Sequence, residues 1–304
     1  MKIVAVVVTF NRLILLKECI KALRSQSIAP DSILIINNGS TDGTLDWLGE
    51  QKDLEVINQK NCGGSGGFYK GLKLGYEKGF DWVWVMDDDT IVDKYALENL
   101  LQTNKIKTDK KIGFISSKIL WVDNTPNLPS LPFVDSRLEK NDIPFNYYDD
   151  KNSLVIKAGT FLSMLINREA IEKVGLPYKE FFIWWDDIEY SHRIYENNFI
   201  GLYSMKSIAF HKTHTNNIEN IINADEKGLW KYKYGLRNEM FFYKKRNIKK
   251  YLKYWMKNII TMPFYILVHS NKSKFRRIFI VYSAYFSSIF FNPKIIYVNK
   301  KVKL

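Results

Sequence analysis

Short apolar runs alternate with helical repeats along the first part of the chain. Four runs have the length and composition of buried strands: 3–8, 32–36, 54–57 and 82–86. A helical repeat at 15–23 separates the first two runs, and a glycine-rich turn at 63–67 with a helix at 69–78 separates the last two. Strands that alternate with helices in this way predict an α/β fold built on a parallel sheet.

Prolines mark a long loop in the middle of the chain. Four of the eight prolines fall between residues 123 and 153, where the periodicity fades. This segment is either a plain surface insertion or a mobile loop over a binding site. Beyond it the pattern predicts renewed periodicity at 155–167, a helix at 168–174, a helix beginning near Asp186 and a strand at 201–210.

Polar segments follow the four predicted strands. They are 9–12, 37–40, 61–67 and 87–89. Ligands of open α/β sheets bind outside the carboxyl ends of the strands, so one sheet edge is expected to gather these segments. The glycine run 61–67, which includes Gly64, lets backbone N–H groups approach an anion at a helix N-terminus. No Gly-Lys-Ser/Thr follows the run, which excludes a Walker motif, and a sharp loop without a ligand is the alternative.

Three adjacent aspartates, Asp87, Asp88 and Asp89, end an apolar strand. Neighbouring carboxylates repel and raise one another's pKa, so a neutralising group is expected beside them. Asp87 and Asp89 can reach one divalent cation, Mg²⁺ or Mn²⁺, that also binds a diphosphate. The alternative is a solvated turn in which an aspartate caps the next helix. His211 is a candidate to complete the metal site, although a lone histidine at such a position is more often structural.

Two tryptophans and two aspartates form a second candidate cluster. Trp184 and Trp185 directly precede Asp186 and Asp187. Indole rings stack against the C–H faces of sugars, and a carboxylate beside them can accept a proton from a hydroxyl group. This combination suggests carbohydrate chemistry. The alternative is an interior aromatic cluster in which one of the aspartates caps a helix.

Composition adds a division of charge to this picture. The 304 residues are 46% apolar and 25% charged, which excludes disorder as the main state. The net charge of +13 divides into −4 for residues 1–230 and +17 for residues 231–304. An acidic body followed by a strongly basic tail predicts two domains, 1–225 and 226–304. The two cysteines, Cys19 and Cys62, cannot build a disulfide framework.

No targeting segment is expected from the apolar runs. Residues 3–8 lack the length and cleavage site of a secretory leader, and 278–293 fall short of the roughly 20 apolar residues of a membrane-spanning helix. We therefore expect a cytoplasmic chain, peripheral at the inner face of the cell membrane.

The basic tail contains two amphipathic helical repeats, 248–260 and 275–290. In the first, apolar and basic residues lie on opposite faces: Ile248, Leu252, Trp255 and Ile259 against Lys249, Lys250, Lys253 and Lys257. Such helices suit an anionic lipid surface. The alternative is that the apolar faces pack on the catalytic domain or on a second copy of the chain. Nucleic acid is not expected as a partner, because the acidic body supplies no basic groove.

The order of these motifs resembles the family 2 glycosyltransferases of the GT-A fold, over about residues 1–215. The matching segments are 7–12, 35–44, 86–90 and 185–189. Three further segments, 61–67, 184–187 and 234–242, are similar to the galactofuranosyltransferase and rhamnosyltransferase branch of bacterial cell-surface polysaccharide synthesis. The resemblance implies a GT-A catalytic domain that takes a UDP- or dTDP-linked sugar donor and a glycan or lipid-linked acceptor.

The resemblance also implies roles for individual residues. The nucleotide sugar would contact Thr9, Arg12, Asn38, Asn61, Gly64 and Asp88. Asp87, Asp89 and His211 would hold Mn²⁺ or Mg²⁺. Asp187 would be the catalytic base, with Asp186 as the alternative, and Trp184 and Trp185 would bind the acceptor sugar together with the loop 123–153. The implied reaction is an inverting transfer of a hexose, with galactofuranose favoured.

One departure from the family pattern affects the donor. Many members carry aspartate where Asn37 or Asn38 stands here, so the choice between a uridine and a thymidine donor stays open, with dTDP-rhamnose as the alternative to UDP-galactofuranose. Two other classes of function are a nucleic-acid-binding protein that uses the basic tail, and a sugar-nucleotide scaffold or nucleotidyltransferase that uses similar aspartates.

Overall fold

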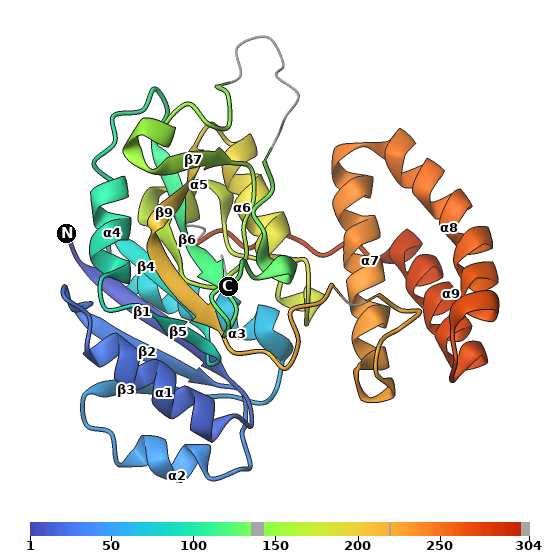
Figure 1. The fold of residues 1–304 in the computed structure, drawn as a ribbon, viewed down its shortest axis with the longest axis horizontal. Coiled ribbons are helices and arrows are strands. Elements are labelled where there is room, and N and C mark those ends of the chain that lie inside the picture. Colours follow the sequence, from blue (N-terminus) through green and yellow to red (C-terminus); the bar gives the residue numbers. More distant parts are fainter. Residues whose placement is uncertain (135–142, 219, 299–304) are drawn as a thin grey trace, which may run out of the picture. The chain divides into compact units, whose positions relative to one another are not determined.

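The computed structural model describes residues 1–134, 143–218 and 220–298 (Figure 1). Contacts divide the chain into two compact units. The sheet unit comprises Met1–Lys179, Asp187–Asn216 and Ile295–Leu304, and the helical unit comprises Glu180–Asp186 and Asn217–Lys294. Part of the expected acceptor loop, residues 135–142, lies outside the described residues.

A nine-stranded sheet forms the centre of the sheet unit, counted over the described residues. Its strands are β1 (Ile3–Thr9), β2 (Ser32–Asn37), β3 (Leu54–Asn58), β4 (Trp82–Asp87), β5 (Thr90–Val92), β6 (Ile112–Leu120), β7 (Ser153–Ile156), β8 (Met164–Asn167) and β9 (Ile200–His211). Their order is β3-β2-β1-β4-β8-β6-β9-β5, and β7 pairs with β9.

The predicted parallel sheet is confirmed for the first four long strands and is wrong for part of the rest. Strands β1, β2, β3 and β4 pair in parallel. Strand β8 is antiparallel to both β4 and β6, so the sheet as a whole is mixed. The renewed periodicity at 155–167 corresponds to the end of β7 and all of β8. Periodicity alone does not show where one short strand ends and the next begins, or whether a strand is parallel or antiparallel, because strand orientation depends on distant partners.

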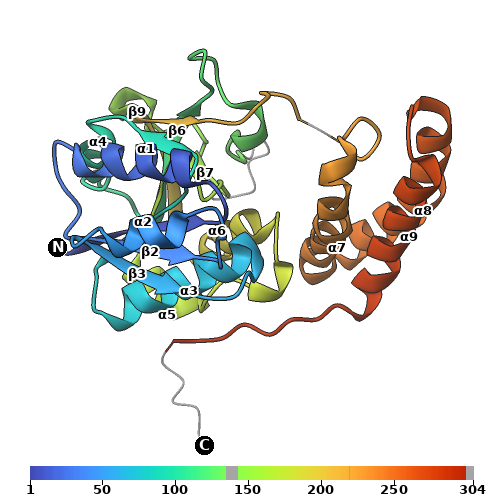
Figure 2. The ribbon, with the colours of Figure 1, turned by 90° about the horizontal axis from the view of Figure 1, so that it is seen from below.

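Six helices of the sheet unit cover both faces of this sheet among the described residues. They are α1 (Leu13–Arg24), α2 (Thr44–Gly49), α3 (Gly63–Glu77), α4 (Ala96–Thr103), α5 (Arg168–Val174) and α6 (Asp186–Glu196). Figure 2 shows α1 and α4 on one side of the sheet and α3 and α5 on the other. Alternate residues of β1 face the two sides: Ala5 and Val7 join one apolar core, and Val4 and Val6 join the other. Burial on both faces explains the continuous apolar run of this strand.

The expected glycine turn at 63–67 is wrong, because these glycines form the first turns of α3. A Cβ atom on Gly67 would lie 2.4 Å from Val8 Cγ1, and one on Gly71 would lie 2.3 Å from Val6 Cγ1. Both distances are far inside van der Waals contact, so only glycine lets the helix backbone approach the sheet this closely. Glycine normally disfavours a helix interior, and here the close helix–sheet packing outweighs that propensity.

The helical unit contains three long helices within its described residues: α7 (Leu229–Arg246), α8 (Ile248–His269) and α9 (Lys274–Phe290). The two predicted helical repeats are confirmed as α8 and α9, and α8 continues through Pro263. Their shared core includes Tyr251, Ile266 and Tyr285. Within the described part of the chain, none of the helices is both long enough and apolar enough to cross a membrane.

The apolar face expected for α8 is only partly buried, since Trp255 and Ile259 are half-buried. Ile248 and Leu252 are exposed, whereas Tyr251 and Ile266 are buried in the core of the helical unit. Trp255 is half-buried, and its indole N–H donates to the Tyr285 carbonyl at 3.0 Å. The helix therefore carries two apolar stripes, one used in packing and one left in contact with solvent.

Candidate active site

The ends of four strands bring the predicted polar residues together at one edge of the sheet. Thr9 ends β1 beside Asn37, which ends β2, and the end of β4 pairs Asp87 with Val8. His211, the last residue of β9, pairs with Thr90 just beyond the aspartate triplet. The register of these strands, rather than any local sequence feature, determines which side chains meet here.

Asp88 is held by the beginning of the loop that follows β1. Its carboxylate accepts a hydrogen bond from Thr9 Oγ1 at 2.7 Å and one from the backbone N–H of Phe10 at 3.4 Å. Burial raises its pKa to about 6, although the hydrogen bond from Thr9 and the positive charge of Arg12 act in the opposite direction. Asp88 is therefore tied to the protein itself, and it fixes the shape of the segment that follows β1.

Arg12 supplies positive charge to the triplet. Its guanidinium forms an ion pair with Asp89 and lies 3.7 Å from Asp88 Oδ1. Burial would raise the pKa of Asp89, but the proximity of His211 and Arg12 outweighs it and lowers that pKa. Asp89 is therefore ionised at neutral pH in spite of being 3% exposed.

Asp89 and His211 form a close pair at the end of β9. Asp89 Oδ1 lies 3.3 Å from His211 Nε2, and no group among the described residues donates an ordinary hydrogen bond to this buried oxygen. His211 Nδ1 lies 3.3 Å from Asn127 Oδ1. The amide of Asn127 is oriented by its own donation to Asn216 Oδ1, so its oxygen faces the imidazole as an acceptor.

The orientation of the Asn127 amide affects whether Asp89 and His211 could bind a divalent ion. With its proton on Nδ1, the imidazole would turn the lone pair of Nε2 toward the carboxylate oxygen, whereas with a proton on Nε2 it would donate to that oxygen and lower the pKa of Asp89. In the first case a cation between the two acceptors would match them, and a carboxylate with an imidazole suits Mn²⁺. Asp89 and His211 thus offer two ligands of the kinds that a divalent ion takes. Within the described residues, no group of three or more His, Cys, Asp or Glu side chains has the geometry of a metal site, so the third expected ligand, Asp87, does not join them closely.

Asn127 is a residue of the site that the sequence analysis missed. It lies in the loop 123–153, is fully buried, and also accepts a hydrogen bond from Ser130 Oγ at 2.6 Å. Its signal in the sequence is weak, because asparagine is common in loops and its partners are 89 and 84 residues away.

The asparagines predicted to bind the donor form hydrogen bonds to other residues of the chain. Asn38 Nδ2 donates to the Gly63 carbonyl at 3.0 Å, and its Oδ1 accepts from Gln59 Nε2 at 2.7 Å. Asn61 Oδ1 accepts from the backbone N–H of Gly63 at 2.9 Å and so joins the start of α3. A Cβ atom on Gly64 would meet nothing within 4 Å, so the first turn of α3 is open at this residue.

Asp187 lies in the first turn of α6, where the sequence predicted a helix to begin. Its Oδ1 accepts from the backbone N–H of Ile188 at 2.7 Å. Burial raises its pKa to about 6, and backbone hydrogen bonds from Ile188, Asp187 itself and Phe161 act in the opposite direction. A carboxylate with a pKa close to the working pH is suited to accept a proton during a reaction. Asp186, which opens the helix, is buried.

The two tryptophans belong to the helical unit and differ in exposure. Trp184 is 39% exposed, and its ring meets Tyr232 edge-on at 5.0 Å. Trp185 is half-buried against Phe242, with ring centroids 5.4 Å apart. Trp184 therefore presents an indole surface to solvent, whereas Trp185 fits the alternative of an aromatic cluster.

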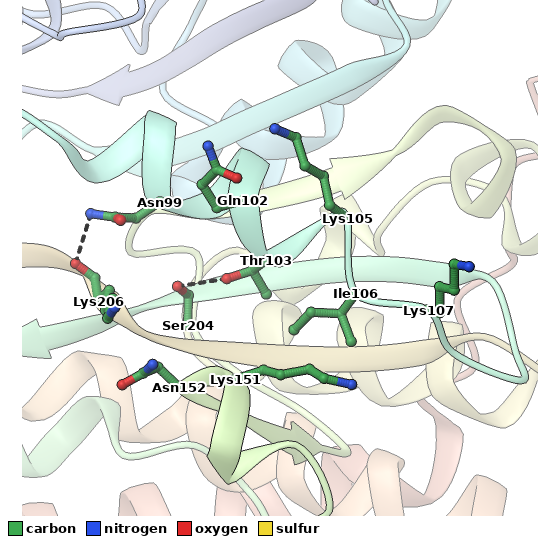
Figure 3. Close-up of a pocket in the computed structure, with 10 residues that line it drawn as sticks. All are labelled: Asn99, Gln102, Thr103, Lys105, Ile106, Lys107, Lys151, Asn152, Ser204 and Lys206. Atoms are coloured by element: carbon green, nitrogen blue, oxygen red, sulfur yellow. Dashed lines mark hydrogen bonds between the residues drawn. The ribbon is translucent and has the colours of Figure 1, made fainter.

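A cavity of about 490 Å³ lies elsewhere in the sheet unit, beside α4 and the middle of β9 (Figure 3). None of the predicted site residues lines it. Two of its lining residues are joined by a hydrogen bond, in which Thr103 Oγ1 donates to Ser204 Oγ at 2.8 Å. In Figure 3 the side chains of Lys105 and Lys151 point away from each other.

A family model and several known proteins are similar to this chain in sequence. The family model "Glycosyl transferase family 2" matches residues 4–175. The galactofuranosyltransferase GlfT1 of Mycolicibacterium smegmatis is 26% identical over 197 residues, which cover 62% of this chain and 64% of that protein. GlfT1 of Mycobacterium tuberculosis is 33% identical over 196 residues, which cover 62% of this chain and 63% of that protein. The match thus spans less than two thirds of these relatives.

Solved structures agree on the fold. GalNAc-T7 in complex with UDP, GalNAc and Mn²⁺ has a TM-score of 0.57 at 13% identity, over 80% of this chain and 48% of that one. The mannosyltransferase PcManGT of Pyrobaculum calidifontis, in complex with GDP-Man and Mn²⁺, has a TM-score of 0.53 at 14% identity, over 96% of this chain and 76% of that one. The expected GT-A architecture with a helical C-terminal region is confirmed.

The family model extends from β1 through α5 and therefore includes the aspartate triplet and the start of α3. The resemblance to galactofuranosyltransferases that the motifs indicated is confirmed by the GlfT1 relatives. The chain belongs to glycosyl transferase family 2.

Proposed function

We propose that this glycosyltransferase moves galactofuranose from UDP-galactofuranose to a glycan or lipid-linked acceptor during the synthesis of a bacterial cell-surface polysaccharide. The GlfT1 relatives support galactofuranose as the sugar. The observation that carries the proposal is Asp187, whose pKa of about 6 and place at the start of α6 suit a general base.

The proposed step is a single displacement with inversion. The oxygen of an acceptor hydroxyl forms a bond to the anomeric carbon of the donor sugar, and the bond from that carbon to the diphosphate oxygen breaks. The hydroxyl proton passes to the carboxylate of Asp187, and the nucleoside diphosphate leaves with the bonding electron pair. Asp187 must therefore be ionised before the step, and its raised pKa makes it a stronger base than an exposed aspartate.

The leaving group develops negative charge at the opposite end of the broken bond. Asp89 and His211, with Asp87 as the third expected ligand, would hold a divalent cation, Mn²⁺ or Mg²⁺. When bound, this ion neutralises charge on the diphosphate. Asn127, whose Oδ1 lies 3.3 Å from Nδ1, would then hold the proton of His211 on Nδ1 and leave Nε2 to the ion. Thr9 and Arg12 hold Asp88 and Asp89 in place beside the diphosphate.

Asn37 lies where the family pattern places a residue that contacts the nucleobase of the donor, and its side chain is held by protein partners. Asn37 Nδ2 donates to Asn58 Oδ1 at 2.9 Å, and Asn37 Oδ1 accepts from the backbone N–H of Ser40 at 3.1 Å. Asn37 or Asn38 stands where many family members have a carboxylate, so the choice of nucleobase stays open and dTDP-rhamnose is the second candidate donor.

The helical unit supports a peripheral attachment to anionic lipid at the inner face of the cell membrane. Phe275, Phe279 and Phe290 of α9 are 84%, 72% and 87% exposed. Lys249, Lys253 and Lys257 are exposed on α8. Exposed aromatic rings on α9 and exposed lysines on α8 match the apolar and anionic layers of a lipid surface. A second copy of this chain offers the same positive charge, so it matches the apolar stripes but not the lysines.

A donor panel tests the function. Purified protein is incubated with Mn²⁺, an acceptor glycoside and, in turn, UDP-galactofuranose, UDP-galactopyranose and dTDP-rhamnose. We expect release of UDP from UDP-galactofuranose and a new glycoside in the product. Release of pyrophosphate would instead indicate a nucleotidyltransferase, and tight binding of a donor without turnover would indicate a scaffold.

A further inference from the structure

The segment that carries Trp184 has a backbone that bulky side chains rarely adopt. Phe182, Trp184 and Trp185 have φ angles of +66°, +64° and +70°. These are three of the nine non-glycine residues with positive φ among the described residues, and they fall within four positions. Each left-handed aromatic residue costs roughly 1–3 kcal/mol, so surrounding contacts must hold the segment in this form. We name residues 181–185 the tryptophan loop.

A single asparagine of α7 makes most of the polar contacts to this loop. Asn238 Nδ2 lies 3.0 Å from the Phe181 carbonyl, 3.1 Å from that of Ile183 and 2.9 Å from that of Trp184. Asn238 is fully buried. Its Oδ1 accepts from Arg237 Nη2 at 2.8 Å, which fixes the amide with its NH₂ group toward the loop.

Packing against α7 reinforces these hydrogen bonds. The ring of Phe182 stacks on Tyr234 at 4.9 Å, and Trp184 meets Tyr232. A Cβ atom on Gly235 would lie 2.5 Å from Trp184 Cε3, so the absence of a side chain at this residue is what lets the indole lie against the helix.

We propose that Asn238 and Gly235 of α7 are positioning residues that hold the tryptophan loop in its left-handed form and so orient the exposed indole of Trp184 for stacking on the acceptor sugar. This inference rests on the proposed glycosyl transfer for its kinetic consequence, because it assigns Trp184 to the acceptor and not to the donor. The structural consequence, a fixed indole, does not depend on the reaction.

Two variants remove the support in different ways. Asn238→Asp keeps the size of the side chain but replaces its NH₂ donor with a carboxylate that faces three carbonyl oxygens. Gly235→Ala removes no hydrogen bond and introduces the better helix former, so a loss of function there cannot come from a weakened helix. The matched control is Asn258→Asp in α8, whose amide donates to Tyr285 Oη at 2.7 Å; that hydroxyl can donate in return to the new carboxylate.

The kinetic experiment uses the full chain with octyl galactofuranoside as the acceptor probe. We expect both variants to raise the acceptor KM by at least about tenfold, because small displacements of a binding group are costly. Donor affinity from calorimetry and the fraction of folded protein should match those of Asn258→Asp. An unchanged acceptor KM, or a fall in kcat alone in proportion to lost folded protein, would overturn the proposal.

A second readout separates this inference from the proposed function. In protein labelled with 5-fluorotryptophan, the ¹⁹F resonance of Trp184 is assigned by its loss in Trp184→Phe. We expect that resonance to shift or broaden in Asn238→Asp and Gly235→Ala and to stay in place in Asn258→Asp. If no donor is turned over by the unaltered chain, the proposed function fails while this measurement still decides the inference: a resonance unchanged in both variants contradicts it.

Discussion

The two units of this protein differ in where most of their acidic, basic and large apolar side chains lie. The sheet unit buries acidic groups, with Asp88 and Asp89 almost inaccessible to solvent. The helical unit exposes lysines and large aromatic rings, Phe275 and Phe279 among them. Burying a carboxylate is costly unless something compensates it, and exposing phenylalanine is unfavourable unless something covers it. Under the proposed function, a cation and a diphosphate would lie beside the buried acids of one unit, and a lipid surface would cover the exposed rings of the other.

The two units also differ in how firmly their charged side chains are held in place. Asp88 of the sheet unit follows the end of a strand and accepts a buried hydrogen bond from Thr9, which fixes its carboxylate. The lysines of α8 lie on an exposed helix face. Precise geometry suits a reaction centre, whereas a loose array of charges is sufficient for a fluid anionic surface. Four predictions test this contrast, from the largest expected effect to the smallest.

Removal of the proposed base should have the largest effect. Asp187→Asn keeps the shape of the side chain but cannot accept the acceptor proton, so we expect turnover to fall about 10²–10⁴-fold. The affinity for the nucleotide sugar, measured by calorimetry, should stay unchanged. Near-normal turnover would remove Asp187 from this role, and a comparable loss confined to Asp186→Asn would transfer the role to Asp186.

Removal of lysines from α8 should weaken attachment to lipid. The triple variant Lys249→Gln, Lys253→Gln, Lys257→Gln should bind vesicles that contain phosphatidylglycerol about 10²-fold less tightly, at about 1 kcal/mol for each lysine. Co-sedimentation measures this, and raised salt should mimic the effect.

The matched control takes three lysines from the rim of the cavity in the sheet unit, as Lys105→Gln, Lys107→Gln and Lys206→Gln. It removes the same charge and should leave vesicle binding close to that of the unaltered chain. Equal losses in the two triple variants would mean that net charge, and not the helical unit, governs binding. A concentration-dependent dimer without lipid binding would assign the exposed stripes to a second copy of the chain.

Neutralising Asp89, the buried carboxylate beside His211, should weaken binding of the nucleotide-sugar donor. Asp89→Asn retains the volume of the side chain and removes the charge that faces His211 and Arg12. We expect Mn²⁺-dependent affinity for UDP to fall at least about tenfold, since loss of one charged ligand is costly. Asp53→Asn, which alters a surface ion pair with Arg24, serves as the control. Unchanged affinity in Asp89→Asn would count against the metal site.

The smallest effect concerns stability. The pKa of Asp187 is raised to about 6 in the folded protein, against about 4 when unfolded. The ionised form is therefore disfavoured by folding, and stability that is present below pH 4 is lost as the pH rises through 6. Asp187→Asn should thus be about 1–3 kcal/mol more stable than the unaltered chain at pH 8 and equal to it at pH 4. Thermal unfolding at the two pH values measures this, and equal stability at both would mean that the carboxylate is not significantly desolvated.

Much of the sheet unit could be predicted because its signals are local. The apolar run at 3–8 and the helical repeat at 15–23 became β1 and α1. The triplet Asp87–Asp89 stood out because carboxylates rarely follow so apolar a strand. The error at α3 has the opposite origin: glycine favours turns in isolation, and only its contact with Val6 and Val8 explains a glycine-rich helix.

Residues that act through distant partners gave little signal. Asn127 and Asn238 are ordinary asparagines in sequence, and their roles come from partners 84 and 54 to 57 residues away. The helix α7 was not predicted, since its apolar and charged residues do not separate into two clear faces. Periodicity detects a helix that buries one side, and α7 contacts the tryptophan loop, α8 and α9 on different sides.

The sequence by itself determined the alternating strands and helices, the order of the family motifs, and the separation of acidic body from basic tail, because each depends on neighbouring residues or on simple counting. The tertiary structure decided that Asp89 meets His211, that α3 can be built from glycines, and that Asn238 holds the tryptophan loop. These features depend on strand register and on contacts between residues far apart in the chain, which the pattern of side chains along it does not encode in any local form.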